Sequence, residues 1–200
     1  MDAILDIAKV LSGLFAGWLL TFLNDWLKRK RDREADAAFL AASVLIALDR
    51  FISGCADVAL DDGTAYGRPA GRSDDGREEY YEAQTSIPEL SWSELKVDWK
   101  SIDPSLMYSV LSIPLELEEA KGYVHGVWDR DTPPYDEHIF ERQLRFAELG
   151  VRVADIAGRL REATGIPTRP PKEWNPERAL RERCKELRER KAKSDPTGWF

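Results

Sequence analysis

The chain contains few of the residues on which disulfide scaffolds and most catalytic sites depend. Its 200 residues include two cysteines and two histidines. Cys55 falls on an apolar helical stripe and Cys184 in a charged helix, so the sequence predicts no disulfide framework and fits a reducing compartment. It also lacks a nucleophile elbow, a glycine-rich phosphate loop and a His-Glu helix motif. We therefore assign no catalytic residue, no metal ligand and no cofactor.

One pair of residues comes closest to a metal site. His138 and Glu141 are three residues apart and therefore share one face of a helix. A di-metal site in a helical bundle uses Glu-x-x-His on two helices, together with two further inward glutamates. Here the order is reversed and it occurs once. Because Asp136 and Glu137 are also the residues that a helix N-terminus favours, the pattern favours a helix start over a metal site.

Charge is absent from residues 10–23, a run in which only Ser12 and Thr21 carry polar side chains. A helix that is apolar on every side must be buried in something large or in lipid. The helices expected later in the chain offer one apolar stripe each, which is too little to enclose it. From Val10 to Leu27 such a helix is about 27 Å long, close to the thickness of the hydrocarbon core. We therefore predict a transmembrane anchor within residues 1–33.

A basic collar follows this run, with five Lys and Arg residues between Lys28 and Arg33. One lysine, Lys9, precedes the span, so the charge bias predicts an outside N-terminus and a cytoplasmic C-terminal domain. This topology describes a single-pass protein of the inner (plasma) membrane, with membrane lipid as its first partner. Trp26 is placed where an interfacial aromatic residue is expected. The predicted membrane-interface residues are Trp26, Lys28, Arg29, Lys30, Arg31 and Arg33.

Two other interpretations of the N-terminus compete with the anchor. A cleaved signal peptide needs a basic start and a small-residue cleavage site, whereas this chain begins with Asp2 and Asp6 and runs into bulky Trp26. An amphipathic helix buried in the core of a soluble domain remains open, because the uncharged run is short for a membrane span.

Small residues form a stripe within the predicted span. In lipid, helices associate where small side chains let their backbones approach closely, and two glycines four residues apart are the usual signature. We therefore predict self-association of the anchor through Ser12, Gly13, Ala16 and Gly17.

The rest of the chain predicts an all-α fold. Residues 34–167 are expected to form a cytosolic bundle of three to four helices, with a long mobile loop at 61–87, and residues 168–200 a charged peripheral helix and tail. Apolar residues at steps of three and four mark a helix from Ala37 to Val58, which we leave open to continue from the anchor. Two further stripes, centred on Leu117 and Val153, are expected to be buried.

Local signals mark where these helices begin and end. Asp103 and Pro104 are an N-cap and a first-turn proline. Pro114 lies inside the following stripe, so we expect a kink there and no termination. Gly165, followed by an apolar residue and a proline, ends the next helix. Before Asp103, the segment with Trp92 and Trp99 is expected to cover an edge of the core as an extended strap.

Charge is unevenly distributed along the chain, whose net charge is −7. Residues 57–103 carry an excess of acidic groups, and residues 168–200 an excess of basic ones. The last helix has little apolar content beyond Leu180, Cys184 and Leu187, and its Glu-to-cation pairs at a spacing of four are typical of a solvated helix. Since no aromatic residues stand among its cations, we do not expect a nucleic-acid partner.

Several short segments resemble a known group of proteins. They run Trp99–Leu106, Leu111–Pro114, Pro133–Glu137, Glu141–Gln143 and Ala147–Gly150, within a region from Pro88 to Pro167. This region resembles a group of bacterial single-pass membrane proteins of unassigned function. The resemblance implies one N-terminal transmembrane helix followed by a cytosolic helical domain. It implies no activity, cofactor or site residue.

The sequence therefore favours a membrane-anchored, non-enzymatic interaction or effector module, of the defence-effector or scaffold type, with self-association and a protein partner that the sequence does not identify. The alternative is a cytosolic enzyme that an amphipathic N-terminal helix docks to the membrane.

Overall fold

The computed structural model describes residues 2–72, 76–168, 170 and 173–194, with side chains from residue 21 onward. The chain is mostly helical, with 68% helix and 5% strand. Its helices are α1 (Asp2–Leu60), η1 (Trp99–Ser101), α2 (Pro104–Leu111), α3 (Ile113–Trp128), α4 (Asp136–Thr164) and α5 (Pro176–Ser194). Its short strands are β1 (Thr64–Ala65), β2 (Arg68–Pro69), β3 (Gly71–Arg72) and β4 (Glu79–Tyr80).

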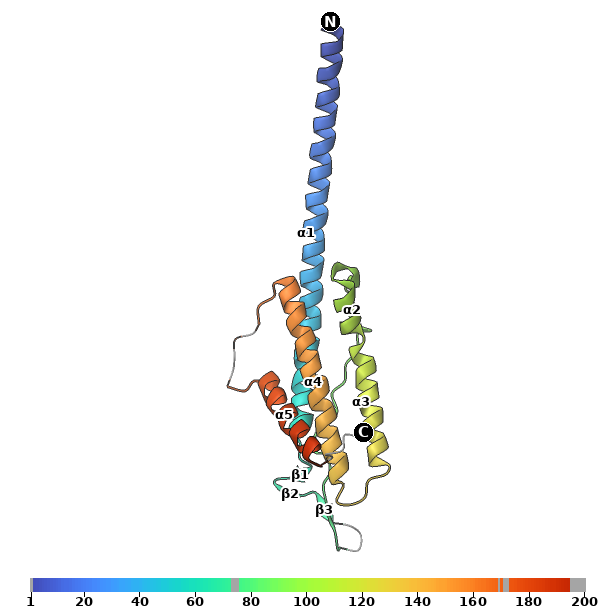
Figure 1. Cartoon of the computed structure of the whole chain (residues 1–200), viewed down its shortest axis with the longest axis vertical. Coiled ribbons are helices and arrows are strands. Elements are labelled where there is room, and N and C mark those ends of the chain that lie inside the picture. The colour runs from blue at the N-terminus through green and yellow to red at the C-terminus, as the bar shows by residue number, and fades with distance from the viewer. Residues whose placement is uncertain (1, 73–75, 169, 171–172, 195–200) are drawn as a thin grey trace.

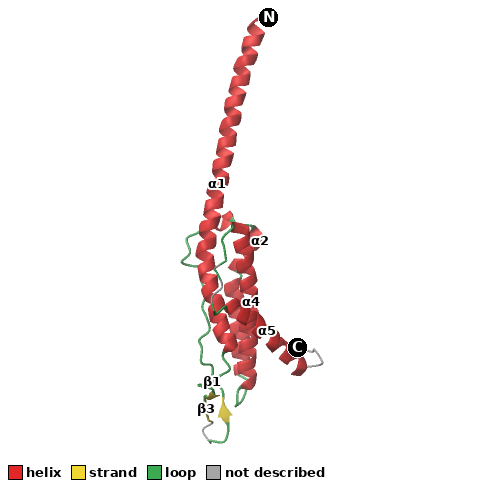
Figure 2. Cartoon of the chain, turned by 90° about the vertical axis from the view of Figure 1, so that its left-hand side faces the viewer, coloured by secondary structure: helices red, strands yellow, loops and turns green. Residues whose placement is uncertain are grey.

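Helix α1 is one continuous element of 59 residues, so the predicted anchor and the first bundle helix are the same helix. At about 1.5 Å per residue it is roughly 88 Å long. Its N-terminal part projects from one end of the bundle (Figures 1 and 2). The side chains of residues 21–36 are exposed, and Leu40 is the first side chain of α1 described as buried. The same helix is thus exposed from residue 21 to residue 36 and central to the core from Leu40 onward.

The core forms around α1 and α4, which pack along each other, while α3 and α5 pack on α4 (Figure 1). The predicted stripes face this core, and Leu117 and Val153 are buried as expected, with exposures of 2% and 0%. Phe51 of α1 and Phe146 of α4 are its largest buried side chains. Hydrophobic burial on these facing stripes is the main stabilising contribution to the bundle.

The predicted start of α2 is confirmed, but the predicted continuity of the helix beyond it is not. Asp103 caps α2, because its carboxylate accepts hydrogen bonds from the backbone N–H of Ser105 and Leu106. The expectation of one helix with a kink at Pro114 is wrong: α2 ends at Leu111, Ser112 lies between the two helices, and Pro114 stands in the first turn of α3, where its missing N–H is no loss. Ser112 keeps right-handed helical dihedrals (φ −78°, ψ −15°), and the apolar residues on its two sides, Val110 and Ile113, are both buried.

The last helix is less peripheral than the sequence suggested. Leu180, Cys184 and Leu187 have exposures of 1%, 5% and 1%, and α5 packs on both α4 and α1. Three apolar residues suffice because they form one narrow stripe and because α4 carries Gly150 beneath it. An added Cβ at Gly150 would lie 2.8 Å from Leu180 Cδ1, so the missing side chain is what lets α5 approach.

The predicted loop at 61–87 contains regular structure that was not expected. Its described part folds into two antiparallel hairpins, β1–β2 and β3–β4, at the end of the bundle opposite the projecting helix (Figure 1). Gly67 permits the first turn because its φ of +73° is accessible to glycine without strain. The expectation of an irregular loop is therefore wrong where these hairpins form.

The strap, residues 84–98, runs along the bundle and covers its edge as predicted. Trp92 is half-buried, donates a hydrogen bond from Nε1 to the carbonyl oxygen of Val110 (3.2 Å), and meets the Trp99 ring edge-to-face. On the α1 side, Pro88 lies directly over Gly54, where an added Cβ would be 2.7 Å from the proline Cβ. Gly54 inside α1 thus lets the strap pack directly against the helix.

Candidate functional site

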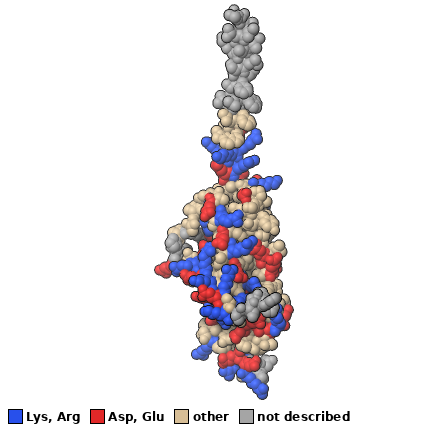
Figure 3. Space-filling model, in the orientation of Figure 1, with Lys and Arg blue, Asp and Glu red and all other residues tan. Residues whose placement is uncertain are grey.

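The predicted membrane-interface residues lie on the stretch of α1 between the uncharged run and the bundle. Lys28, Arg29, Lys30, Arg31 and Arg33 are all exposed there. Figure 3 shows Lys and Arg side chains, with some Asp and Glu among them, at the point where α1 leaves the bundle. Trp26 is 54% exposed, with Lys30 Nζ 5.9 Å from its ring centroid. The structure therefore brings together an exposed indole and a ring of cations.

One side of this collar faces the end of the bundle and lines a pocket of about 440 Å³. Helix α1 contributes Trp26, Arg29, Lys30 and Arg33, together with Glu34 and Ala37, and the bundle contributes Ser101 of η1 and Ala163 of α4. Lys28 and Arg31 do not line it. The collar therefore has two unequal sides.

Helix α1 is long and apolar enough to cross a membrane. Its Thr21–Leu60 part contains an 18-residue stretch with mean hydropathy 1.7 and at most two charged residues, 44% of which is buried. A stretch with at most two charged residues cannot include the basic collar. It therefore lies within residues 37–56, inside the bundle. The side chains of residues 10–20, most of the predicted span, lie outside those that the structure describes. The residues of the small-residue stripe, Ser12, Gly13, Ala16 and Gly17, are among them.

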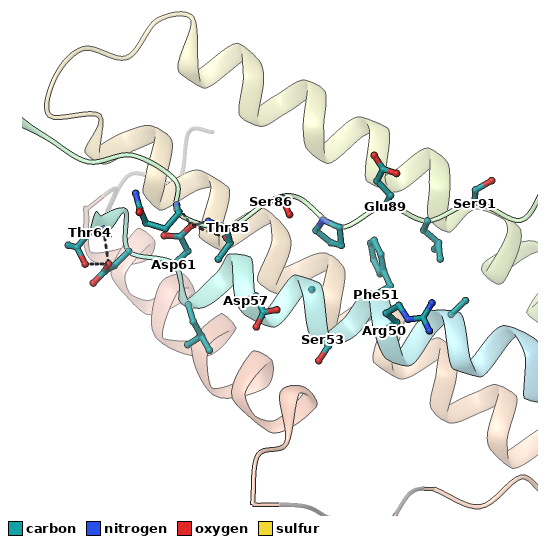
Figure 4. A pocket seen from close by; sticks show the side chains of 17 residues that line it. Arg50, Phe51, Ser53, Asp57, Asp61, Thr64, Thr85, Ser86, Glu89 and Ser91 are labelled. Carbon is teal, nitrogen blue, oxygen red and sulfur yellow. Dashed lines mark hydrogen bonds between the residues drawn. The ribbon is translucent and has the colours of Figure 1, made fainter. Parts of the chain in front are cut away.

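A groove of about 1120 Å³ runs between α1 and the strap. Figure 4 shows Arg50, Ser53 and Asp57 on the α1 side and strap residues, including Ser86 and Glu89, on the other. Arg50, Asp57 and Glu89 are exposed and form no ion pair with any residue that the structure describes. The groove is therefore open and carries exposed charges of both signs beside apolar residues.

A buried ion pair closes one end of this groove. Asp61, just beyond α1, and Arg142 of α4 have side-chain exposures of 2% and 4%, with Arg142 Nη1 3.0 Å from Asp61 Oδ2. Asp61 Oδ2 also accepts hydrogen bonds from the backbone N–H of Gln84 and Thr85 and from the Thr85 hydroxyl, all at 2.8 Å. Asp61 Oδ1 accepts one from the backbone N–H of Gly63 at 3.0 Å. The carboxylate thus fastens the strap to the end of α1.

These contacts govern the ionisation of Asp61. Burial by itself raises its pKa, but the hydrogen bonds from Thr85 and Gly63 and the positive charge of Arg142 outweigh burial and lower the pKa below its usual value of 3.8. Arg142 also binds the strap, because Nη2 donates to the carbonyl oxygen of Thr85 at 2.6 Å. A buried ion pair with this many hydrogen bonds holds a segment in one position.

Gln143 extends the network to α5. Its Nε2 donates to the carbonyl oxygen of Asp61 (2.8 Å), and its Oε1 accepts from Arg183 Nη2 (3.2 Å). Sequence reasoning missed this network. The signal that could have revealed it is the pair Arg142 and Gln143, two polar residues at the core-facing position between Ile139 and Phe146.

The two residues considered for a metal site have other contacts. The His138 ring meets Trp128 edge-to-face, with centroids 4.9 Å apart. Glu141 accepts a hydrogen bond from Lys191 Nζ at 2.6 Å and has Arg145 Nε at 3.6 Å. Among the described residues, no group of three or more His, Cys, Asp or Glu side chains is arranged to hold a metal ion.

Comparison of the chain with protein-family models, with curated proteins and with solved structures gives no match.

Proposed function

We propose that this protein is a membrane-anchored, non-enzymatic interaction module in which α1 is both the anchor and the central helix of the bundle. The observation that carries the proposal is the continuity of α1 from Asp2 to Leu60. The bundle then stands in the cytoplasm below an inner membrane, with the N-terminus outside, in accordance with the basic collar that follows the uncharged run.

A continuous helix has a mechanical consequence. Because every backbone hydrogen bond of a helix connects neighbouring turns, tilt or displacement of the anchor is passed to the part that packs in the core. Association of anchors through the small-residue stripe at residues 12–17 would then bring bundles together in a defined orientation. This coupling suits an effector or scaffold that converts assembly in the membrane into assembly in the cytoplasm.

The groove between α1 and the strap is the surface that we assign to a protein partner. Its exposed charges, Arg50, Asp57 and Glu89, are of both signs. Such a surface suits a polar partner whose own charges are placed opposite these three. Anchoring matters for such a partner, since both molecules at one membrane meet at a raised local concentration.

Topology and membrane attachment test the proposal together. A cytoplasmic reporter fused after Phe200 is expected to be active, and a periplasmic reporter at the same position inactive. The protein is expected to stay in the membrane pellet after carbonate washing, while a chain that begins at residue 34 is expected to be released. Release of the full chain, or activity of the periplasmic reporter, would contradict the anchor.

A further inference from the structure

We propose that the pocket at the exit of α1 from the bundle binds the phosphate of an anionic phospholipid headgroup, a proposal that rests on the membrane anchoring proposed above. The pocket is built from the collar on one side and from η1 and the last turn of α4 on the other. The two sides lie far apart in the sequence, so folding of the bundle is what creates the pocket.

The shape of the pocket depends on small residues. Ala37 and Ala163 face it from the two helices, and Ser101 closes it from η1. Their short side chains leave about 440 Å³, within the range of roughly 300–1,000 Å³ that is usual for small-molecule sites. The space is large enough for a headgroup, and it lies at the end of the bundle nearest the predicted span.

The charge of the pocket is suited to a phosphate. Arg29, Lys30 and Arg33 line it, and one acidic residue, Glu34, opposes them. Glu34 already has a partner, because its Oε1 lies 3.9 Å from Lys30 Nζ. Arg29 and Arg33 form no ion pair with the residues that the structure describes, and guanidinium groups bind phosphate oxygens through paired hydrogen bonds.

The surroundings favour a phosphate that is carried by a lipid. Leu23 and Leu27, just before the collar, are 45% and 47% exposed, and Trp26 is 54% exposed. Apolar side chains of this kind give acyl chains a surface to contact, and tryptophan is typical of the headgroup level. A phospholipid therefore satisfies both the apolar turn of α1 and the cationic turn beside it, whereas a free phosphate satisfies only the second.

Binding of this kind would tie the collar to the bundle end through one molecule. A headgroup that bridges α1 with η1 and α4 would fix the bundle against the membrane surface, which restricts how it can tilt around the anchor. The lipid composition of the membrane would then influence how the groove is presented to a partner.

The test compares two sides of the same helix. The full chain in neutral detergent is mixed with equal amounts of phosphatidylglycerol and phosphatidylcholine of identical acyl chains, and native mass spectrometry measures the ratio of the two bound lipids. The test variant is Arg29→Gln/Arg33→Gln, and the control is Lys28→Gln/Arg31→Gln, which removes the same charge from residues outside the pocket. All four positions are exposed on α1, so glutamine leaves the bundle core intact.

We expect the wild-type chain to prefer phosphatidylglycerol and the test variant to lose about tenfold to thirtyfold of that preference. The control is expected to lose less than about threefold, because its cations act only at a distance. Equal losses in both variants would overturn the proposal and show a diffuse attraction to the whole collar. Displacement of the lipid by soluble glycerol phosphate at an equal concentration would also overturn it, in favour of a site for free phosphate.

Carbonate washing of the same variants separates this proposal from the anchoring. Both variants are expected to stay in the membrane pellet, because the uncharged run is unchanged. Extraction of the wild-type chain would contradict the anchor, while the lipid preference, which is measured in detergent, would still be decided by the two variants alone.

Discussion

Replacing Gly150 of α4 with alanine tests how closely three helices of the bundle approach. An added Cβ there would lie 2.8 Å from Cys55 Cβ of α1 and 2.8 Å from Leu180 Cδ1 of α5. Real Cβ contacts are longer than this, so something must shift. The leucine methyl group can rotate, but Cys55 Cβ is fixed to the α1 backbone, so relief there requires the helices to separate.

The size of the effect follows from two opposing contributions. Alanine in a helix is favoured over glycine by about 1 kcal/mol, and overpacking of a filled core costs about 1–3 kcal/mol. Gly158, on the same helix, has no atom within 4 Å of an added Cβ. Gly158→Ala is therefore expected to stabilise the bundle by about 0.5–1 kcal/mol. The difference between the two variants cancels the helix preference and isolates the steric cost, about 1–3 kcal/mol.

The assay is urea unfolding of the full chain, followed by circular dichroism at a fixed detergent concentration. We expect the midpoint to fall for Gly150→Ala relative to Gly158→Ala, with unchanged slopes. Equal stabilisation by both substitutions would refute the reasoning, because it would mean that α1, α4 and α5 do not approach as closely as the structure describes.

The remaining predictions concern the core, the ion pair and the anchor. Leu117→Ala is expected to lower the free energy of unfolding by about 2–5 kcal/mol in urea titrations, while Leu115→Ala, at a position 63% exposed, should change it by less than about 0.5 kcal/mol. Because folding lowers the pKa of Asp61, its contribution to stability is complete above about pH 4 and is lost as the pH falls through the folded-state pKa. Unfolding between pH 6 and pH 2 should therefore show a weaker acid dependence in Asp61→Asn, and an unchanged dependence would exclude this carboxylate as its source. In a genetic membrane-dimerisation assay of residues 1–33, Gly13→Leu/Gly17→Leu should reduce the signal, and an equal signal would remove the small-residue stripe from the proposed function.

Features with a local physical cause could be predicted from the sequence. Asp103 and Pro104 begin a helix because a side-chain acceptor and a fixed φ act within one turn. Gly165, with φ of +68°, ends α4 because glycine adopts the left-handed conformation without a Cβ penalty. The burial of Leu117 and Val153 follows in the same way from the spacing of apolar residues on a helix.

Features that depend on residues far apart in the chain could not be predicted. Three apolar residues looked too few to hold α5, because the sequence does not show that Gly150 faces Leu180. Asp61 looked like a loop residue, because its partner Arg142 is 81 positions away. The 61–87 hairpins likewise depend on turns that composition alone does not distinguish from an irregular loop.

The collar shows most clearly which features follow from the sequence and which from the tertiary structure. Its composition and its place after the uncharged run come from consecutive residues, and these alone predict an interface between membrane and cytoplasm. Its division into two sides is a tertiary property, since only the packing of η1 and α4 against α1 brings Ser101 and Ala163 to Arg29 and Arg33 while leaving Lys28 and Arg31 outside the pocket. Helix periodicity and charge act over a few residues and can be read directly. The pairing of surfaces depends on which helices meet, and that is decided by the shape of the whole core.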